Sequence, residues 1–188
     1  MGTTFLILLG LIVLLLLYGV VLYNGLVRAR QLVMEAWSGI DVQLKRRSDL
    51  IPNLVETVKG YASHEAGTLR EVTELRERAR AVPDGDVAGR ARAEGLLGQA
   101  LGRLFAVAEA YPDLKASENF GQLQASLETV ESEIQMARRY YNGAARDLNI
   151  KVESVPSNFV AGPFGFRKAE YFEIDDPADR AVPQVAFS

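Results

Sequence analysis

The chain has 188 residues, no cysteine, one histidine and a formal net charge of −3. Without cysteine it cannot form disulfides, thiolate zinc sites or a cysteine nucleophile, and one histidine excludes metal sites built from paired histidines. A mildly acidic chain argues against nucleic acid as the main partner. We therefore expect no cofactor, no metal site and no nucleic-acid partner.

An apolar run occupies the N-terminal end of the chain. Of the 18 residues from Phe5 to Leu22, all but Gly10, Tyr18 and Gly19 are Leu, Ile, Val or Phe. At a rise of about 1.5 Å per residue, a helix of some 20 residues crosses a hydrocarbon core of roughly 30 Å. A cleaved signal peptide would need a preceding basic segment and a shorter apolar core, and no Lys or Arg precedes this run. The sequence therefore predicts one retained transmembrane helix.

Basic residues follow the apolar run closely. Arg28 and Arg30 come first, and Lys45, Arg46 and Arg47 come later. Because positive flanking charge stays on the cytoplasmic side, we expect the N-terminus outside and the following domain in the cytoplasm. These five residues are candidate contacts to lipid headgroups or to a partner, and ion pairs on an exposed helix face are an equal alternative.

The chain after the run has the apolar spacing of helices, and no strand-type alternation of useful length precedes residue 150. Shorter stripes begin at Val33, Ile51 and Leu97. The residues from Asp49 to Pro52 indicate either a helix end and restart, a hinge or a structural cap. The longest stripe follows steps of three and four, through Phe120, Leu123, Leu127, Val130, Ile134, Ala137, Tyr141, Ala144 and Leu148.

These patterns predict an all-α protein, in which a transmembrane helix is followed by an antiparallel bundle of about four long helices. We divide the chain into a transmembrane anchor over residues 1–27, a helical-bundle domain over 28–150 and an extended C-terminal tail over 151–188. The tail holds four of the seven prolines and is rich in aromatic residues. Since disordered tails are usually poor in aromatics, we expect it to pack on the bundle or on a neighbouring subunit.

Five aromatic residues are candidates for contacts with a partner. Trp37 either packs in the core beside Ile40 and Leu44 or contacts another subunit. The other four lie in the tail, at Phe164, Phe166, Tyr171 and Phe172.

Motifs that would carry catalysis are incomplete in this sequence. His64-Glu65 begins like the helix of a zinc protease, but Thr68 stands where the second histidine is required. Acidic pairs on helix faces lack the histidines of di-iron bundles. We therefore predict no catalytic residues and no enzymatic activity.

Sequence blocks spread along nearly the whole chain resemble the LemA family. The resemblance implies a bacterial, single-pass membrane protein with a helical-bundle domain, hence a location in the inner membrane, and it implies no particular reaction. One branch of that family is associated with magnetosome membranes. The matching blocks are Tyr23–Trp37, Ile40–Arg47, Asp49–Val55, Val58–Glu65, Tyr111–Ala116, Ala137–Asn142, Gly165-Phe166, Tyr171–Glu173 and Pro183–Phe187.

Two classes of function fit this sequence. The first is a membrane-tethered scaffold or adaptor whose bundle associates with copies of itself or with another membrane protein; a membrane-shaping oligomer is a narrower form of it. The second is an enzyme or small-ligand sensor with a site in the bundle that uses acidic residues and Lys59 or Lys115. The missing catalytic motifs favour the first, with the lipid bilayer and a homo-oligomer as the expected partners.

Overall fold

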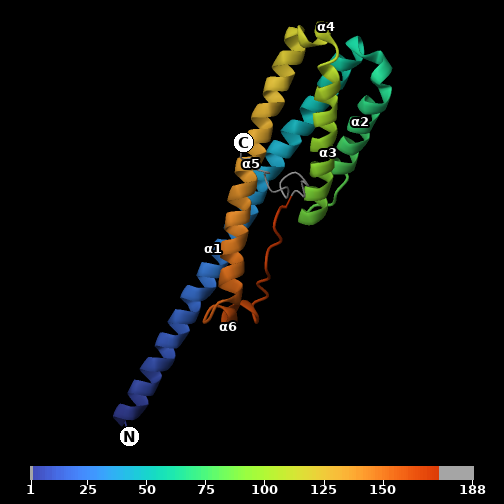
Figure 1. Cartoon of the computed structure of the whole chain (residues 1–188). Helices are drawn as coiled ribbons and strands as arrows, with labels where there is room; N and C mark the ends of the chain where they lie inside the picture. Colours follow the sequence, from blue (N-terminus) through green and yellow to red (C-terminus); the bar gives the residue numbers. More distant parts are fainter. Residues whose placement is uncertain (1, 174–188) are drawn as a thin grey trace, which may run out of the picture. The chain divides into compact units, whose positions relative to one another are not determined.

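A computed structural model of the protein describes residues 2–173 (Figure 1). This part of the chain is helical and contains no strand, as the apolar spacing predicts. It divides into two compact units: unit 1 comprises residues 2–40 and 137–170, and unit 2 comprises residues 41–136 and 171–173. The helices are α1 (Gly2–Tyr61), η1 (Ser63–Glu65, a 3-10 turn), α2 (Ala66–Arg80), α3 (Val87–Ala108), α4 (Pro112–Lys115), α5 (Glu118–Glu153) and α6 (Asn158–Ala161).

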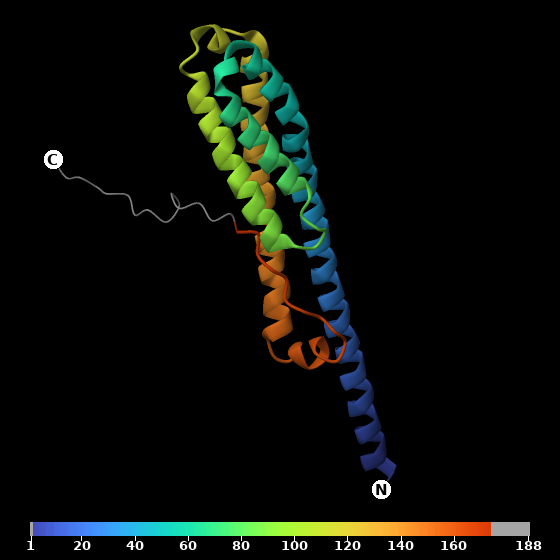
Figure 2. The ribbon, with the colours of Figure 1, turned by 90° about the vertical axis from the view of Figure 1, so that its right-hand side faces the viewer.

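Unit 1 contains the N-terminal part of α1 and the C-terminal part of α5, which lie side by side (Figure 2). The Trp37 ring packs edge-on against Tyr141 at 5.4 Å. Further toward the N-terminus, Lys151 Nζ donates to the Gly25 carbonyl at 3.3 Å. The apolar start of α1 has a mean hydropathy of 3.1 with none of it buried, so this helix is long and apolar enough to cross a membrane.

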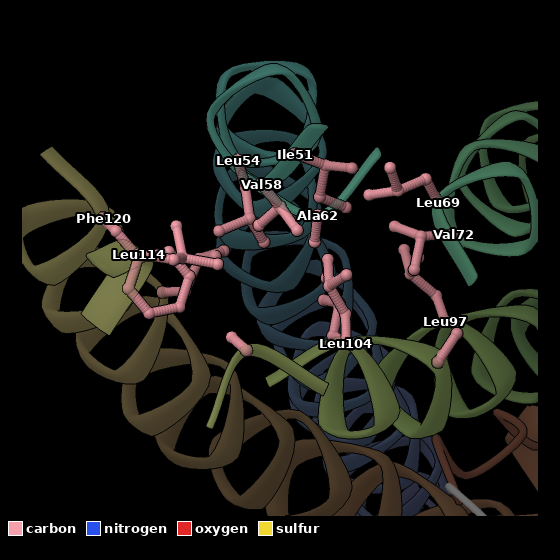
Figure 3. Packing of buried hydrophobic residues seen from close by; sticks show 14 of the residues in the cluster. Ile51, Leu54, Val58, Ala62, Leu69, Val72, Leu97, Leu104, Leu114 and Phe120 are labelled. Atoms are coloured by element: carbon pink, nitrogen blue, oxygen red, sulfur yellow. The ribbon is translucent and has the colours of Figure 1, made fainter. Parts of the chain in front are cut away.

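Unit 2 is a bundle to which α1, α2, α3 and α5 each contribute (Figure 3). A turn between Arg80 and Val87 connects α2 to α3. Gly85 has a φ of +90° there, and Asp86 caps α3 by accepting from the Gly89 amide at 2.8 Å. The buried core contains Ile51, Leu54, Val58, Ala62, Leu69, Val72, Ala79, Leu97, Ala100, Leu101, Leu104, Ala108, Leu114, Phe120 and Leu127.

Of the three alternatives for residues Asp49 to Pro52, a helix end and a structural cap are wrong, because α1 continues through Pro52 to Tyr61. Proline has no N–H, so it leaves the carbonyl four residues earlier without its helical partner. That carbonyl belongs to Ser48, and Arg76 Nε of α2 donates to it at 2.7 Å. A side chain from a second helix therefore replaces the lost backbone hydrogen bond, which allows the helix to continue.

The break falls instead at Ala62, where the backbone leaves the helical region with φ −124° and ψ 55°. Apolar spacing predicts one helix from Ile51 past this point, whereas the structure has a chain reversal at η1. Residues on both sides of the reversal lie in the same core. The apolar spacing therefore survives the break and cannot reveal it. Near the reversal, the Tyr111 hydroxyl donates to Glu65 Oε1 at 3.1 Å.

The hydrogen bond to the Ser48 carbonyl gives a test by double-mutant cycle. Arg76→Ala leaves this carbonyl without its partner, and we expect the free energy of unfolding to fall by about 1–3 kcal/mol. In a Pro52→Ala background, the new backbone N–H can donate to the same carbonyl, so Arg76→Ala should cost less. Urea unfolding in detergent followed by circular dichroism measures the difference, which should exceed about 0.5 kcal/mol.

Arg78→Ala, at an exposed position of α2, is the matched control and should cost little in either background. Equal losses for Arg76→Ala with and without Pro52 would show that the side chain does not compensate for the proline.

Candidate functional site

Two oppositely charged side chains lie in the interior of unit 2. Arg47 of α1 is 2% exposed and Glu94 of α3 is 3% exposed. Arg47 Nη2 donates to the Glu94 carboxylate and, at 3.1 Å, to the Glu94 carbonyl. Its Nη1 donates to Glu131 Oε2 of α5 at 2.8 Å. One guanidinium therefore connects three helices, and its buried charge is balanced by carboxylates.

Arg47 is thus not presented to lipid headgroups, contrary to its prediction as a contact residue. The reason lies in its spacing: Arg47 continues the buried stripe of Ile40, Leu44 and Ile51. Glu94 likewise stands in the stripe of buried positions on α3. Opposite charges at apolar-stripe positions of two helices are therefore a sequence signal for a buried ion pair.

Further charges surround this buried pair. Arg90 Nη1 lies 4.0 Å from Glu94 Oε1, and its Nη2 lies 3.8 Å from Asp41 Oδ1. The adjacent hollow has a volume of about 210 Å³, whereas pockets for small ligands usually enclose roughly 300–1,000 Å³. Because the charges are engaged with one another and the hollow is small, the cluster is suited to holding helices together.

The other four predicted basic residues are exposed. Arg28 and Arg30 follow the apolar run, and the Arg30 guanidinium lies over the Phe166 ring, 5.0 Å from its centroid. Lys45 pairs with Asp49 at 3.3 Å on α1, and Arg46 pairs with Glu133 at 3.1 Å. Their contact with headgroups or a partner stays a prediction.

The predicted aromatic residues separate into buried and exposed members. In unit 1, Tyr23 lies at the end of the apolar run, with the Phe164 ring at 5.0 Å and the Phe166 ring at 5.6 Å from it. Phe166 is buried, whereas Phe164 is 63% exposed. In unit 2, Phe172 is buried and Tyr171 is 40% exposed. Phe166 and Phe172 therefore pack within the protein rather than on its surface.

Side chains of α5 hold the segment that follows α6. The Asn149 side chain accepts from the Ala169 amide at 2.7 Å and donates to the Ala169 carbonyl at 3.0 Å. The Tyr141 hydroxyl donates to the Glu170 carbonyl at 2.9 Å. Burial, and then the charge of Glu170, raise the pKa of Tyr141, which further favours the protonated hydroxyl that donates this hydrogen bond. Tyr141 belongs to the apolar stripe of the sequence, whereas no sequence pattern indicates that Asn149 binds this segment.

Little in the described residues resembles a catalytic centre. Residues 2–173 contain no group of three or more His, Asp or Glu that could hold a metal. Lys59 and Lys115, the lysines of the enzyme alternative, are exposed and pair with Glu56 and Glu109. A hollow of about 480 Å³ between α1 and α5 does not include either lysine; it is lined by Asn53, Glu56, Thr57, Asn119, Gln122, Leu123 and Ser126.

Comparison with known proteins identifies related sequences. The model of the LemA family matches residues 36–187. Magnetosome protein MamQ 2 of Paramagnetospirillum magneticum is 29% identical over 189 aligned residues, which cover 87% of this chain and 70% of that protein. Magnetosome protein MamQ of Magnetospirillum gryphiswaldense is 26% identical over the same shares of the two chains. Protein LemA of Metamycoplasma hominis is 28% identical, with 81% of this chain and 69% of that protein covered.

The buried ion pair gives a stability test. Glu94→Ala removes the main partner of a buried guanidinium, and we expect the free energy of unfolding to fall by about 3–5 kcal/mol. Replacing both charges, with Arg47→Met and Glu94→Leu together, should recover most of that loss because no uncompensated charge remains. Thermal and urea unfolding in detergent measure both.

Lys45→Met removes an exposed charge from the same helix and serves as the control, with an expected loss below about 1 kcal/mol. If the double replacement is as unstable as Glu94→Ala, the cost does not come from an unpaired buried charge.

Proposed function

The chain belongs to the LemA family, and from its helical architecture we propose that it is a membrane-tethered scaffold or adaptor without enzymatic activity. The N-terminal helix anchors it in the bacterial inner membrane. The helical domain on the cytoplasmic side binds copies of the same chain or other membrane proteins. The observation that carries this proposal is an exposed apolar face on α5 in unit 1.

Two large apolar side chains mark that face, about 15 Å apart along α5, and the exposed Asp147 lies between them. Tyr140 is 54% exposed and Ile150 is 52% exposed. At about 100° per residue, these two positions fall within an arc of roughly 80° on the helix. Tyr141 and Leu148, which are buried, point to the other side of α5. The exposed pair is therefore not part of the internal core, and it offers a surface that a protein partner can cover.

Anchoring in a membrane makes such a small surface effective. Chains held in one bilayer diffuse in two dimensions and share an orientation, which raises their effective concentration for one another. A contact through two aromatic or aliphatic side chains is too weak to hold free domains together. Between chains in one membrane, the same contact can form a populated complex. The buried charges of unit 2 are paired with one another. Exposed side chains are therefore the better candidates for binding another protein.

The proposed orientation rests on the exposed Arg28 and Arg30, which directly follow the apolar part of α1. Arginine close to the end of a span favours the cytoplasmic side. The relatives that are named as magnetosome proteins support a membrane location for this chain.

The exposed face of α5 is tested by cross-linking in cells. Because the chain has no cysteine, Tyr140→Cys or Ile150→Cys introduces a single thiol. We expect a bis-maleimide to convert a large share of either variant into a homodimer or into one defined complex with another membrane protein. Arg78→Cys, on an exposed part of α2, should give at most a trace of cross-linked product.

Tyr140→Asp combined with Ile150→Asp should abolish the complex seen in detergent-solubilised membranes, while the helical content stays unchanged because both positions are exposed. The proposal would be contradicted if both thiol variants stay at the mass of the monomer after cross-linking and the Asp double variant still forms the complex.

The orientation is tested with the same single-thiol approach. Ser38 is exposed in unit 1, beyond the apolar run. In intact spheroplasts, a membrane-impermeant maleimide should label Thr3→Cys but not Ser38→Cys. After permeabilisation it should label both. Labelling of Ser38→Cys before permeabilisation would place the domain outside the cytoplasm.

A further inference from the structure

The segment between α5 and the tail is free of charge. Residues 154–166, here called the uncharged loop, contain no Asp, Glu, Lys or Arg, and they include α6. The residues around this segment are charged: Lys151 and Glu153 precede it, and Arg167 and Lys168 follow it. A sharply bounded apolar loop of this kind is unusual on a surface that faces water alone.

The loop exposes three of its apolar side chains. Val155 and Phe159 are each 72% exposed, and Phe164 is 63% exposed. Other apolar members of the same loop are turned inward: Phe166 is 6% exposed and Ala161 is 1% exposed. One side of the loop therefore packs against the protein, and the exposed residues stand on its other side. Leaving two phenylalanines in water is unfavourable, so a covering environment is expected.

Contacts within unit 1 place the loop next to the end of the apolar run. Leu26 is fully buried in one cluster with Ala161 and Phe166. The ring of Phe164 lies 5.0 Å from that of Tyr23. Figure 2 shows α6 beside this part of α1. The loop is thus attached to α1 within the first turn or so after Leu22.

This position corresponds to the surface layer of a bilayer. Leu26 lies four residues beyond Leu22, which is about 6 Å along the helix. The polar layer on each side of the hydrocarbon core is roughly 5–8 Å thick. A loop that packs on Tyr23 and Leu26 therefore lies at the depth of the headgroups when the apolar run spans the membrane. Aromatic side chains are favoured at that depth.

The charges near the loop also fit a lipid surface. Arg28 and Arg30 are exposed on α1, as is Arg167 after the loop. Lys151 Nζ donates to the Gly25 carbonyl, so it is held at the same level. Lys168 is neutralised by Glu153 at 2.7 Å. Basic side chains at headgroup depth attract anionic lipids.

From these contacts we propose that the uncharged loop inserts Val155, Phe159 and Phe164 into the interface of the bilayer that α1 spans. The loop then forms a second, shallow attachment to the membrane. Because it is attached to α1 through Leu26 and Phe166, this attachment fixes the rotation of α1 about its axis. The lipid bilayer, and not a second protein, covers these side chains.

Depth measurement in vesicles tests the insertion. The full chain carrying Phe159→Cys is labelled with a nitroxide and reconstituted into vesicles of phosphatidylcholine and phosphatidylglycerol. Collision rates are measured with oxygen, which concentrates in lipid, and with a nickel chelate, which stays in water. We expect the oxygen-to-nickel ratio at position 159 to be several-fold higher than in a matched chain with Ser38→Cys, an exposed position further along α1.

A second substitution separates insertion from local structure. Phe164→Asp in the chain labelled at position 159 should lower the ratio several-fold, whereas Phe164→Leu should preserve it. Circular dichroism should be the same for both, since Phe164 is exposed.

Two results would overturn the proposal. A ratio at position 159 equal to that at position 38 would show that the loop lies in water. Access by neither oxygen nor the nickel chelate would show that protein covers it. Neither result depends on the scaffold function, which the cross-linking of α5 tests separately.

Discussion

Continuity of α1 is the constraint on which the rest of this protein depends. Pro52 removes one helical hydrogen bond, and Arg76 of α2 provides a new partner for the Ser48 carbonyl. The same helix can therefore begin with an apolar run long enough to span a bilayer and continue with the core positions of unit 2. Because the helix is not interrupted, it needs no linker between the membrane-spanning residues and the residues that build the bundle.

The interior of the bundle combines many interchangeable contacts with one that is specific. Leucine and alanine positions on neighbouring helices can pack in more than one register at small cost. The two Nη groups of Arg47 are both paired with carboxylates only where Glu94 and Glu131 both reach them. We infer that this buried pair selects one arrangement of α1, α3 and α5, while hydrophobic burial supplies most of the stability.

Unit 1 has two kinds of exposed apolar surface. The uncharged loop lies beside the end of the apolar run, where lipid is the natural covering. The exposed side of α5 that carries Tyr140 and Ile150 points away from the buried side of the same helix, which carries Tyr141 and Leu148. A shallow attachment that fixes the rotation of α1 would also fix the direction of this face. Lateral association of anchored chains then requires only a modest contact area.

The amino-acid sequence determined the helical class and the apolar run, because these follow from local spacing and composition. Tertiary structure decided the rest. The path through Pro52 depends on the Arg76 side chain, 28 residues beyond the Ser48 carbonyl to which it donates, and the burial of Arg47 depends on a partner 47 residues away. The energy of a lost backbone bond or a buried charge is set by such distant partners, which local patterns do not specify.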